Sequence, residues 1–406
     1  MTPLERLQWI ICFSGFLDLF GVAMLYPLLI HQAKTLGATP GQVGLFGSIY
    51  GTLQFFTSPI MGQLSDHVGR RTVLLMSLVG TAVGYILLGM SNSIILMALA
   101  RVPSGIFKHS QSMSRTYLAD ISPPQQRASA FGMFNSMSSL GFIVGPTLGG
   151  ILSTTENGFQ RVAMLSSLLF ILNACFVYLL IPKYFGDKKM DEGSRITPNK
   201  PKFDFLSSLN TFKDVHLIPW HLVWDVFTVR FLMSFSMILY RSNSSSVLAY
   251  KFDADARTNG YIISFNGIVS AIAGVLVRWI APYFSSNSSL NNAFSIILIL
   301  SLVAITLAPT LFVVVIAMIP LCIASSVLRV TNATAIFNRG GERVRGLVNG
   351  LGDTLTSLAR ALGPAIAGYA QEVSLYGPGG CGIVLAVIGT LVGLYSPAED
   401  WKFHVE

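Results

Sequence analysis

The chain has 406 residues, of which about half are apolar and only 11% are charged, and its mean hydropathy is +0.61. Soluble domains carry roughly 25% charged residues, so this composition leaves too little polar surface to cover a globule in water and excludes a soluble enzyme. The net charge of +8 would suit nucleic acid, but the lysines and arginines stand singly between apolar runs, so we expect no nucleic-acid partner.

Two kinds of pattern are missing from the sequence, and their absence excludes further classes of protein. The four cysteines stand alone, without C-x-x-C or metal-ligand spacing, so we expect packing residues and neither disulfides nor a metal site. The sequence contains no H-E-x-x-H, no G-x-S-x-G and no G-x-x-x-x-G-K-[ST] phosphate loop. We therefore expect no enzyme, no cofactor and no direct use of ATP.

Long apolar runs dominate the chain from one end to the other. A membrane helix needs about 20 mostly apolar residues, and twelve such runs can be drawn between charged, Pro, Asn or Gly boundaries. The sequence therefore predicts an all-α integral membrane protein with twelve transmembrane helices. The predicted spans cover residues 8–30, 42–63, 72–91, 94–118, 128–153, 161–181, 222–247, 259–280, 291–308, 312–335, 346–370 and 376–396.

The first predicted span carries a carboxylate, Asp18, followed by Gly21 and Pro27. Charges inside a span are costly and mark functional positions, usually at a wet cavity. Two interpretations stay open: Asp18 takes up a proton when it is desolvated, or it stays ionised in a fixed pair with a neighbouring cation such as Lys108 or Arg101.

A short loop follows the second predicted span and reads Gly62-Gln-Leu-Ser-Asp66-His-Val-Gly69-Arg70-Arg71. It fits the pattern G-x-x-x-D-x-x-G-R-R at every fixed position. The glycines allow a tight turn, and the Asp66 carboxylate can accept hydrogen bonds from the start of a neighbouring helix. We interpret this loop as the most specific local signal in the sequence.

The fourth predicted span is unusually polar. Arg101, Ser104, Lys108, Gln111 and Arg115 are spaced three and four residues apart, which predicts one basic helical face. Alternatively, the two outer arginines reach the membrane surfaces and only Lys108 is deep.

The residue after Lys108, His109, could titrate near neutral pH, although a single His in a helix is more often a structural hydrogen-bond donor.

The fifth predicted span contains Gly141-x-x-x-Gly145-Pro146-x-x-Gly149-Gly150. Such a Gly/Pro set favours a pliable helix that a neighbouring helix can approach closely. Simple close packing explains the same residues equally well.

One long polar stretch, residues 183–221, interrupts the apolar pattern and reads as a cytoplasmic linker. It divides the chain into predicted six-helix bundles at 1–182 and 222–406. In the second bundle, Arg241 and Arg360 are predicted to be deep in the membrane. Four further in-span charges lie nearer the inner surface and could be gate or snorkelling residues: Asp225, Arg230, Arg329 and Asp353.

An internal repeat supports this division. Moving the second half back by 218 residues aligns Gly145-Pro146 with Gly363-Pro364, and Gly150 with Gly368. Moving it by 216 residues instead aligns Gly44 with Gly260, Ser48 with Ser264 and Gly51 with Gly267. The fifth span therefore corresponds to the eleventh and the second to the eighth, which predicts two pseudo-symmetric bundles.

The positions of the basic residues predict the orientation, because Lys and Arg resist translocation. With the N-terminus inside, most loop cations are cytoplasmic, and few lie opposite: Lys34, Arg161, Lys251 and Arg257. Both termini are therefore predicted to be cytoplasmic, while the sequence does not specify which membrane holds the protein.

The loop at 62–71, the Arg101-x-x-x-Gly105 pattern and the Gly/Pro set of the fifth span together resemble motifs of the major facilitator superfamily of transporters. The acid, Gly and Pro of the first span resemble its tetracycline/proton antiporters. Longer stretches around Phe20, Lys108 and Trp224 resemble an animal branch that is similar to the proton-coupled drug antiporters.

This resemblance implies a cytoplasmic gate in which Asp66 faces Gly346 and Arg70 pairs with Asp120, and it suggests antiport. The second half departs from the pattern, because Arg278 stands where an acid is expected. A symmetric second gate is therefore in doubt.

These observations predict a monomeric secondary transporter that moves a small solute across the bilayer, coupled to protons or another ion. Unpaired cations in a cavity of low dielectric constant attract carboxylate, sulfate or phosphate groups, so an organic anion is the favoured solute. The substrate and proton site would then include Asp18, Arg101, Lys108, His109, Arg241 and Arg360.

Two alternatives stay open. In the first, Asp18 binds a lipophilic cation and the protein is a drug/proton antiporter. In the second, the protein keeps this fold without transporting and serves as a membrane sensor or scaffold.

Overall fold

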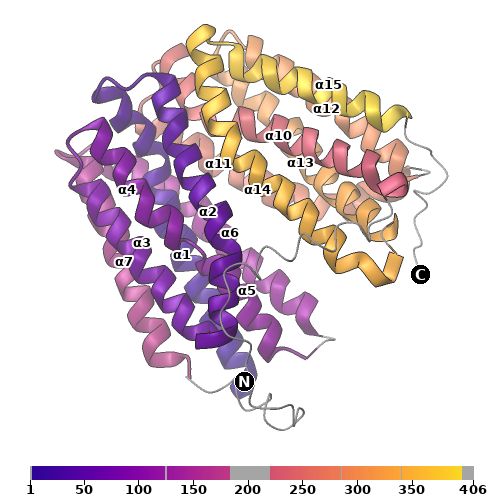
Figure 1. Cartoon of the computed structure of the whole chain (residues 1–406). Coiled ribbons are helices and arrows are strands. Elements are labelled where there is room, and N and C mark those ends of the chain that lie inside the picture. Colours follow the sequence, from indigo (N-terminus) through magenta and orange to yellow (C-terminus); the bar gives the residue numbers. More distant parts are fainter. Residues whose placement is uncertain (1, 124–125, 183–219, 285, 340, 396–406) are drawn as a thin grey trace. The chain divides into compact units, whose positions relative to one another are not determined.

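The computed structural model describes residues 2–123, 126–182, 220–284, 286–339 and 341–395. Within these ranges the regular structure is helical, with one short 3-10 turn, η3 (Ala281–Tyr283), and no strands (Figure 1). The predicted all-α fold class is confirmed. The linker predicted at 183–221 lies almost wholly outside the described residues.

The helices follow the predicted spans closely, because each apolar run extends to the first capping or helix-breaking residue. Eight of those described are long and apolar enough to cross a membrane. The helices of the first half are α1 (Pro3–Thr35), α2 (Pro40–Val68), α3 (Arg70–Gly89), α4 (Ile94–Phe107), α5 (Ser110–Ile121), α6 (Arg127–Leu152) and α7 (Gly158–Leu180). Those of the second half are α10 (Trp220–Lys251), α11 (Ala256–Ile280), α12 (Asn287–Leu307), α13 (Leu311–Arg339), α14 (Gly341–Val373) and α15 (Gly377–Tyr395).

The fourth predicted span is the exception, because it consists of two helices, α4 and α5, rather than one. The prediction of a continuous helix over 94–118, with its five polar residues on one face, is therefore wrong. Lys108 and His109 leave the helical conformation, with backbone angles φ −73°, ψ 68° and φ −117°, ψ 7°.

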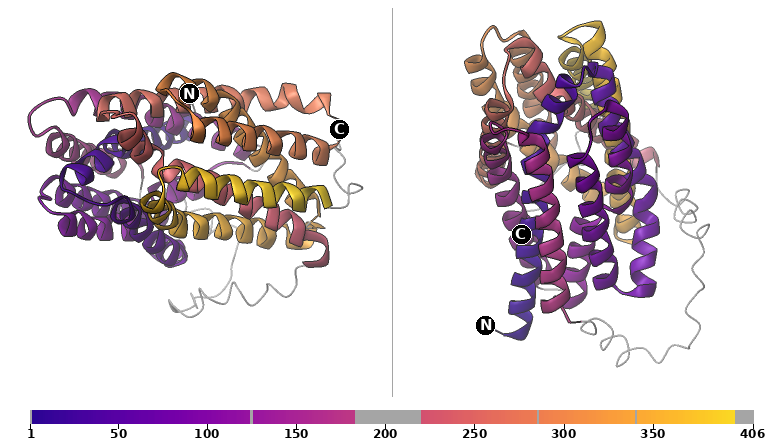
Figure 2. Two further views of the ribbon diagram at one scale, coloured as in Figure 1. Left: turned by 90° about the horizontal axis from the view of Figure 1, so that it is seen from above. Right: turned by 90° about the vertical axis from the view of Figure 1, so that its left-hand side faces the viewer.

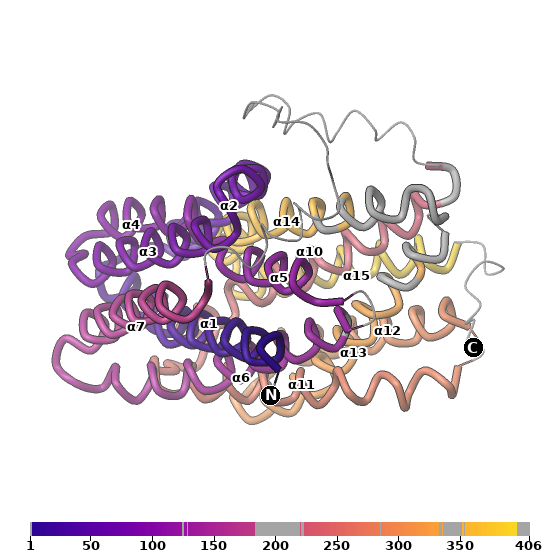
Figure 3. Tube along the Cα trace, turned by 90° about the horizontal axis from the view of Figure 1, so that it is seen from below, coloured from indigo at the N-terminus to yellow at the C-terminus, as the bar shows by residue number. Residues whose placement is uncertain are grey.

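The helices gather into two compact units. In the first, α1 contacts α6 and α7, and α3 contacts α4 and α7 (Figure 3). In the second, α10 contacts α14 and α15, and α12 contacts α13 and α15, which is yellow in Figure 2. Helices α2 and α11 each contribute one segment to each unit, since residues 37–52 belong to the second unit and 256–264 to the first. The bundle boundaries that the sequence suggests stay a prediction.

The glycines of α6 allow it to pack closely on α1. A Cβ atom at Gly141 would collide with the carbonyl oxygen of Phe16, and one at Gly149 with the carbonyl oxygen of Met24. At Gly145, such an atom would come within 2.8 Å of the Ala23 Cβ atom. These glycines recur every four residues and so face α1 along one line of the helix.

The residues of the internal repeat make matching contacts within each unit. In the second unit, a Cβ atom at Gly44 of α2 would collide with the Pro364 carbonyl oxygen, and Ser48 Oγ accepts a hydrogen bond of 2.9 Å from the Ala365 amide.

In the first unit, a Cβ atom at Gly260 of α11 would collide with the Pro146 carbonyl oxygen, and Thr147 Oγ1 bonds Ser264 Oγ at 2.8 Å. The repeated small residues thus mark two equivalent helix crossings.

This packing predicts opposite effects for two glycines of α6. Gly149→Ala should lower the free energy of unfolding by about 1–3 kcal/mol, because the added methyl group forces α1 and α6 apart. Gly132→Ala should be neutral or raise it by up to about 1 kcal/mol, since alanine favours the helix and its methyl group would have no atom within 4 Å.

Thermal unfolding of the two detergent-purified variants beside the parent checks this pair. Equal destabilisation by both substitutions would contradict the close contact between α1 and α6.

Candidate functional site

A buried carboxylate lies near the middle of α1. The Asp18 side chain is almost completely enclosed, with 1% of its surface exposed. An ionised carboxylate in such a place is costly unless it is paired and hydrogen-bonded. The structure supplies both kinds of partner.

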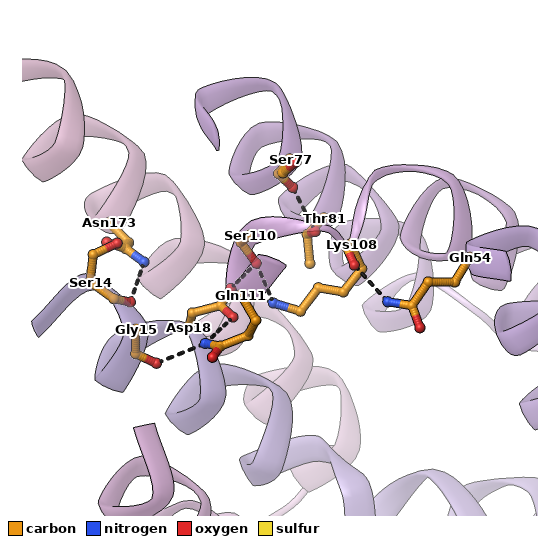
Figure 4. Close-up of polar contacts among 10 residues, drawn as sticks. All are labelled: Ser14, Gly15, Asp18, Gln54, Ser77, Thr81, Lys108, Ser110, Gln111 and Asn173. Atoms are coloured by element: carbon orange, nitrogen blue, oxygen red, sulfur yellow. Dashed lines mark hydrogen bonds and ion pairs between the residues drawn. The ribbon is translucent and has the colours of Figure 1, made fainter. Parts of the chain in front are cut away.

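The cation is Lys108, whose Nζ atom donates to Asp18 Oδ1 in a buried ion pair (Figure 4). Ser110 Oγ donates to the same carboxylate oxygen at 2.7 Å, and Gln111 Nε2 donates to Asp18 Oδ2 at 2.9 Å. Lys108 Nζ also donates to Ser110 Oγ at 3.0 Å. All three side chains that contact the Asp18 carboxylate donate hydrogen bonds to it, so the network suits an ionised carboxylate.

The interruption between α4 and α5 places Lys108 in this network. The bend leaves the Lys108 carbonyl without its helical partner, and Gln54 Nε2 of α2 donates to it at 2.7 Å. His109 begins α5 as its N-cap residue, and its Nε2 atom lies 2.9 Å from Thr57 Oγ1. The Gln54 side chain of α2 thus satisfies a backbone carbonyl at the interruption, as irregular backbone at membrane depth requires.

Apolar and amide groups surround the pair. The Phe170 ring of α7 lies 4.8 Å from Lys108 Nζ, so the ammonium group also faces an aromatic ring. Asn173 Nδ2, one turn further along α7, donates to the Ser14 carbonyl of α1 at 3.0 Å. The helices α1, α2, α5 and α7 therefore all contact one polar cluster.

The candidate residues of the fourth span separate in the structure. Lys108 and His109 are buried at the interruption, whereas Arg101 lies half-buried on α4. Arg115 is exposed on α5, and its Nη2 atom donates to Asn135 Oδ1 at 3.0 Å. Because α4 ends at Phe107, no single helical face carries all of these side chains.

The cations of the second unit are arginines, and their surroundings differ from those of Lys108. Arg241 on α10 and Arg329 on α13 are both exposed, and their guanidinium charges lie within range of each other. Among the side chains that the structure describes, which do not include Asp353, no carboxylate forms an ion pair with either arginine. Both charges also act on Cys322, whose Sγ atom donates to Asn266 Oδ1 at 2.6 Å.

Arg360, the remaining deep candidate, is exposed on α14, and its Nη2 atom donates to Ser357 Oγ at 3.0 Å on the same helix.

The loop after α2 forms a small ion-pair cluster. Arg70 Nε donates to Asp120 Oδ2 at 3.0 Å, which is the pair that the resemblance implies, and Arg70 Nη1 lies 2.5 Å from Asp66 Oδ1. Gly69 has φ +93°, a conformation that glycine adopts without strain. Arg71 donates to the Tyr178 carbonyl oxygen at 2.5 Å. Gly346 is the predicted partner of Asp66, and its surroundings lie outside the described part of the chain.

Sequence reasoning missed several members of the site. Gln54 and Thr57 are single polar residues in an apolar span, and only the interruption of a neighbouring helix gives them a role. Nothing in the sequence connects Arg329 with Arg241, although their charges lie within range of each other. Within the described residues, no three His, Cys, Asp or Glu side chains gather as they would to hold a metal ion.

Comparison with known proteins gives a consistent result. A family model described as Major Facilitator Superfamily matches residues 11–364. The quinolone resistance protein NorA of Staphylococcus aureus (strain MRSA252) is 24% identical over 395 residues, which are 95% of each chain. The major facilitator superfamily domain-containing protein 10 of Mus musculus is 26% identical over 340 residues, 80% of this chain and 72% of that protein.

Solved structures share the fold. A bacterial homolog of the human lysosomal transporter Spinster, in an inward-facing and unoccupied conformation, has a TM-score of 0.77 and 16% identity, with 100% of both chains covered. The human organic anion transporter MFSD10 has a TM-score of 0.63 and 20% identity, with 97% of this chain and 100% of that chain covered.

The buried pair makes a prediction about stability. Asp18→Asn and Lys108→Met should each lower the free energy of unfolding by about 3–5 kcal/mol, because each leaves an uncompensated buried charge. The double variant should recover most of that loss. Asp120→Asn, which breaks the exposed pair with Arg70, should cost less than about 1 kcal/mol.

A double-mutant cycle on thermal unfolding in detergent measures this coupling. If the double variant is as unstable as the sum of the single variants, Asp18 and Lys108 do not form a buried pair.

Proposed function

Because the chain belongs to the Major Facilitator Superfamily, whose members move solutes by alternating access around a site near the membrane midplane, we propose that it transports a small organic anion in exchange with protons. It is a multi-pass membrane transporter and not an enzyme. The identity of the solute and the coupling to protons are the parts of this statement that are proposed.

The unequal distribution of charge in the two units carries the proposal. In the first unit, the deep cation Lys108 is neutralised by Asp18. In the second unit, Arg241 and Arg329 lie within range of each other's charge, and no described carboxylate pairs with them. Guanidinium groups bind carboxylate, sulfate or phosphate through two parallel hydrogen bonds. An anion would relieve the repulsion between the two arginines.

Proton coupling is proposed from the hydrogen bonds around Asp18. All three side chains that contact it are donors, so a proton on the carboxylate would have to displace at least one of them. Protonation would also remove the charge that holds Lys108. Lys108 lies where α4 meets α5, and its release would free this junction to move.

The relatives support the two parts of the proposal separately. The structure of human MFSD10 is described as that of an organic anion transporter. The tetracycline resistance protein, class H, of Pasteurella multocida is 30% identical over 165 residues, 39% of this chain and 41% of that protein.

A second candidate, a drug/proton antiporter that carries cations, is favoured by the full-length similarity to NorA. In that case Asp18 would bind the cation after Lys108 has moved away. The absence of a described carboxylate beside Arg241 and Arg329 favours the anion instead.

We also propose the other roles that the sequence predicts. Bundles at 1–182 and 222–406 would rock about the central site, with both termini cytoplasmic and the protein a monomer. The loop residues Gly62, Asp66, Gly69 and Arg71, together with the Arg70 pair to Asp120, would form the cytoplasmic gate.

Arg101, His109 and Arg360 would line the path of the solute. The glycines of α6 and Pro146 would allow that helix to bend.

The first transport prediction concerns the arginines. In proteoliposomes, Arg241→Gln and Arg329→Gln should each weaken uptake of a transported organic anion about tenfold to hundredfold, because each removes a charged hydrogen bond to the solute. Arg278→Gln is the matched control, since Arg278 is exposed and lies 5.0 Å from the Trp279 ring.

A panel of anionic and cationic dyes, compared in the parent and these variants, identifies the sign of the solute charge. Uptake of cations alone, with no effect of either arginine variant, would contradict the anion and favour the drug antiporter.

The second transport prediction concerns the proton. Asp18→Asn should abolish the stimulation of transport by a pH gradient while leaving anion binding within about twofold of the parent, since the arginines carry the binding. Glu156→Gln, which changes an exposed acid in the same unit, should leave the gradient dependence intact. A correctly inserted Asp18→Asn protein with the parent's gradient dependence would overturn this role.

A further inference from the structure

A cavity lies at the end of α10. None of the residues that line it has a role in the proposed transport function. The centre of a water-sized sphere can occupy about 40 Å³ inside it, and it lies entirely within the second unit. Its walls are mostly apolar and include Val247, Leu248, Phe252, Ile305, Val314 and Leu375.

The lining residues of α10 show that the cavity is elongated. Tyr240, Ser244, Val247, Leu248 and Lys251 all line it, at spacings of three and four residues that place them on one face of the helix. From Tyr240 to Lys251 this face runs for about 16 Å, at 1.5 Å per residue. The shape and lining therefore suit an extended aliphatic chain.

One end of the cavity carries a cation. Lys251 Nζ donates to the Thr306 carbonyl oxygen at 3.0 Å and lies 4.9 Å from the Tyr376 ring and 5.3 Å from the Phe252 ring. An ammonium group has three donors, and only one is used here. Among the described residues, no carboxylate forms an ion pair with Lys251. Lys251 is therefore able to bind an anionic group.

The cation lies where membrane helices end. Lys251 is the last residue of α10, Thr306 lies next to the end of α12, and the other walls come from the start of α13 and the connection between α14 and α15. The ends of transmembrane helices lie at the level of the lipid head groups. The cavity thus has its charged end at the membrane surface and its apolar length towards the membrane interior.

We propose that this cavity binds an anionic amphiphile, with the aliphatic chain along α10 and the carboxylate or phosphate on Lys251. A free fatty acid and an anionic phospholipid share this chemistry. The site is separate from the proposed transport site, because Arg241 and Arg329 do not line it.

The test measures thermal unfolding of the full chain in phosphatidylcholine nanodiscs titrated with decanoate. Decanoate should raise the unfolding midpoint by mass action, whereas decylamine, which has the same chain length, should not. Lys251→Gln should weaken decanoate binding on the order of tenfold, and Lys251→Arg should retain it.

Two further variants keep the proposal testable if Lys251→Gln folds poorly. Val247→Trp should fill the cavity and abolish the effect, while Val275→Trp, at a position 62% exposed on α11, should not. In the Arg241→Gln background, Lys251→Gln should still weaken the decanoate effect, so that failure of the transport proposal and failure of this one can be distinguished.

Nanodiscs that contain phosphatidylglycerol distinguish the two sources. If this lipid raises the midpoint in a Lys251-dependent manner and prevents the decanoate effect, the natural occupant is a phospholipid. If only decanoate acts, it is a free acid. Equal effects of decanoate and decylamine, or a decanoate effect that neither Lys251→Gln nor Val247→Trp changes, would overturn the proposal.

Discussion

The structure of the first unit depends on one requirement: a carboxylate and an ammonium group buried in the membrane must neutralise each other. Asp18 lies on the uninterrupted helix α1, so Lys108 has to reach it. In the fourth span, Lys108 and His109 leave the helical conformation, and Lys108 reaches Asp18 from this interruption. The Lys108 carbonyl at this interruption accepts a hydrogen bond from the Gln54 side chain of α2, which gives this polar residue a role inside a membrane helix.

The close contacts of the small residues impose a second constraint. Gly44 against Pro364 and Gly260 against Pro146 are equivalent crossings that the internal repeat places in the two units. In each crossing, a serine hydroxyl bonds the partner helix one turn further along. The hydrophobic effect does not drive helices together in lipid, so such close packing and hydrogen bonding supply the attraction. The repeat in the sequence therefore reflects a repeated packing solution.

Local patterns in the sequence predicted the helices, whereas contacts between distant residues were implied by the family resemblance or left open. Span positions follow from apolar length, and the pairing of Arg70 with Asp120, 50 positions apart, was implied by the resemblance alone. The interruption at Lys108 was missed because helical periodicity assumes a continuous helix, and neither Lys108 nor His109 is a helix breaker. A pair of Asp18 with Lys108, 90 positions apart, was one of the interpretations that the in-span charges left open, and the structure brings these two side chains together. Whether the expected site residues bind a solute stays a prediction.

The arginines of the second unit and the Lys108 ammonium group of the first suggest which residues bind the solute and which couple its transport to protons. Arginine keeps its proton at every physiological pH, so Arg241 and Arg329 give the second unit a constant positive charge. Asp18 and Lys108 form a buried ion pair, and carboxylate and ammonium groups both have a neutral form that differs by one proton. A proton that reaches Asp18 therefore changes the charge of the first unit without weakening the attraction for an anion in the second. Under the proposed function, a proton would act on the junction between α4 and α5, and it would affect the solute only through the conformation of the protein.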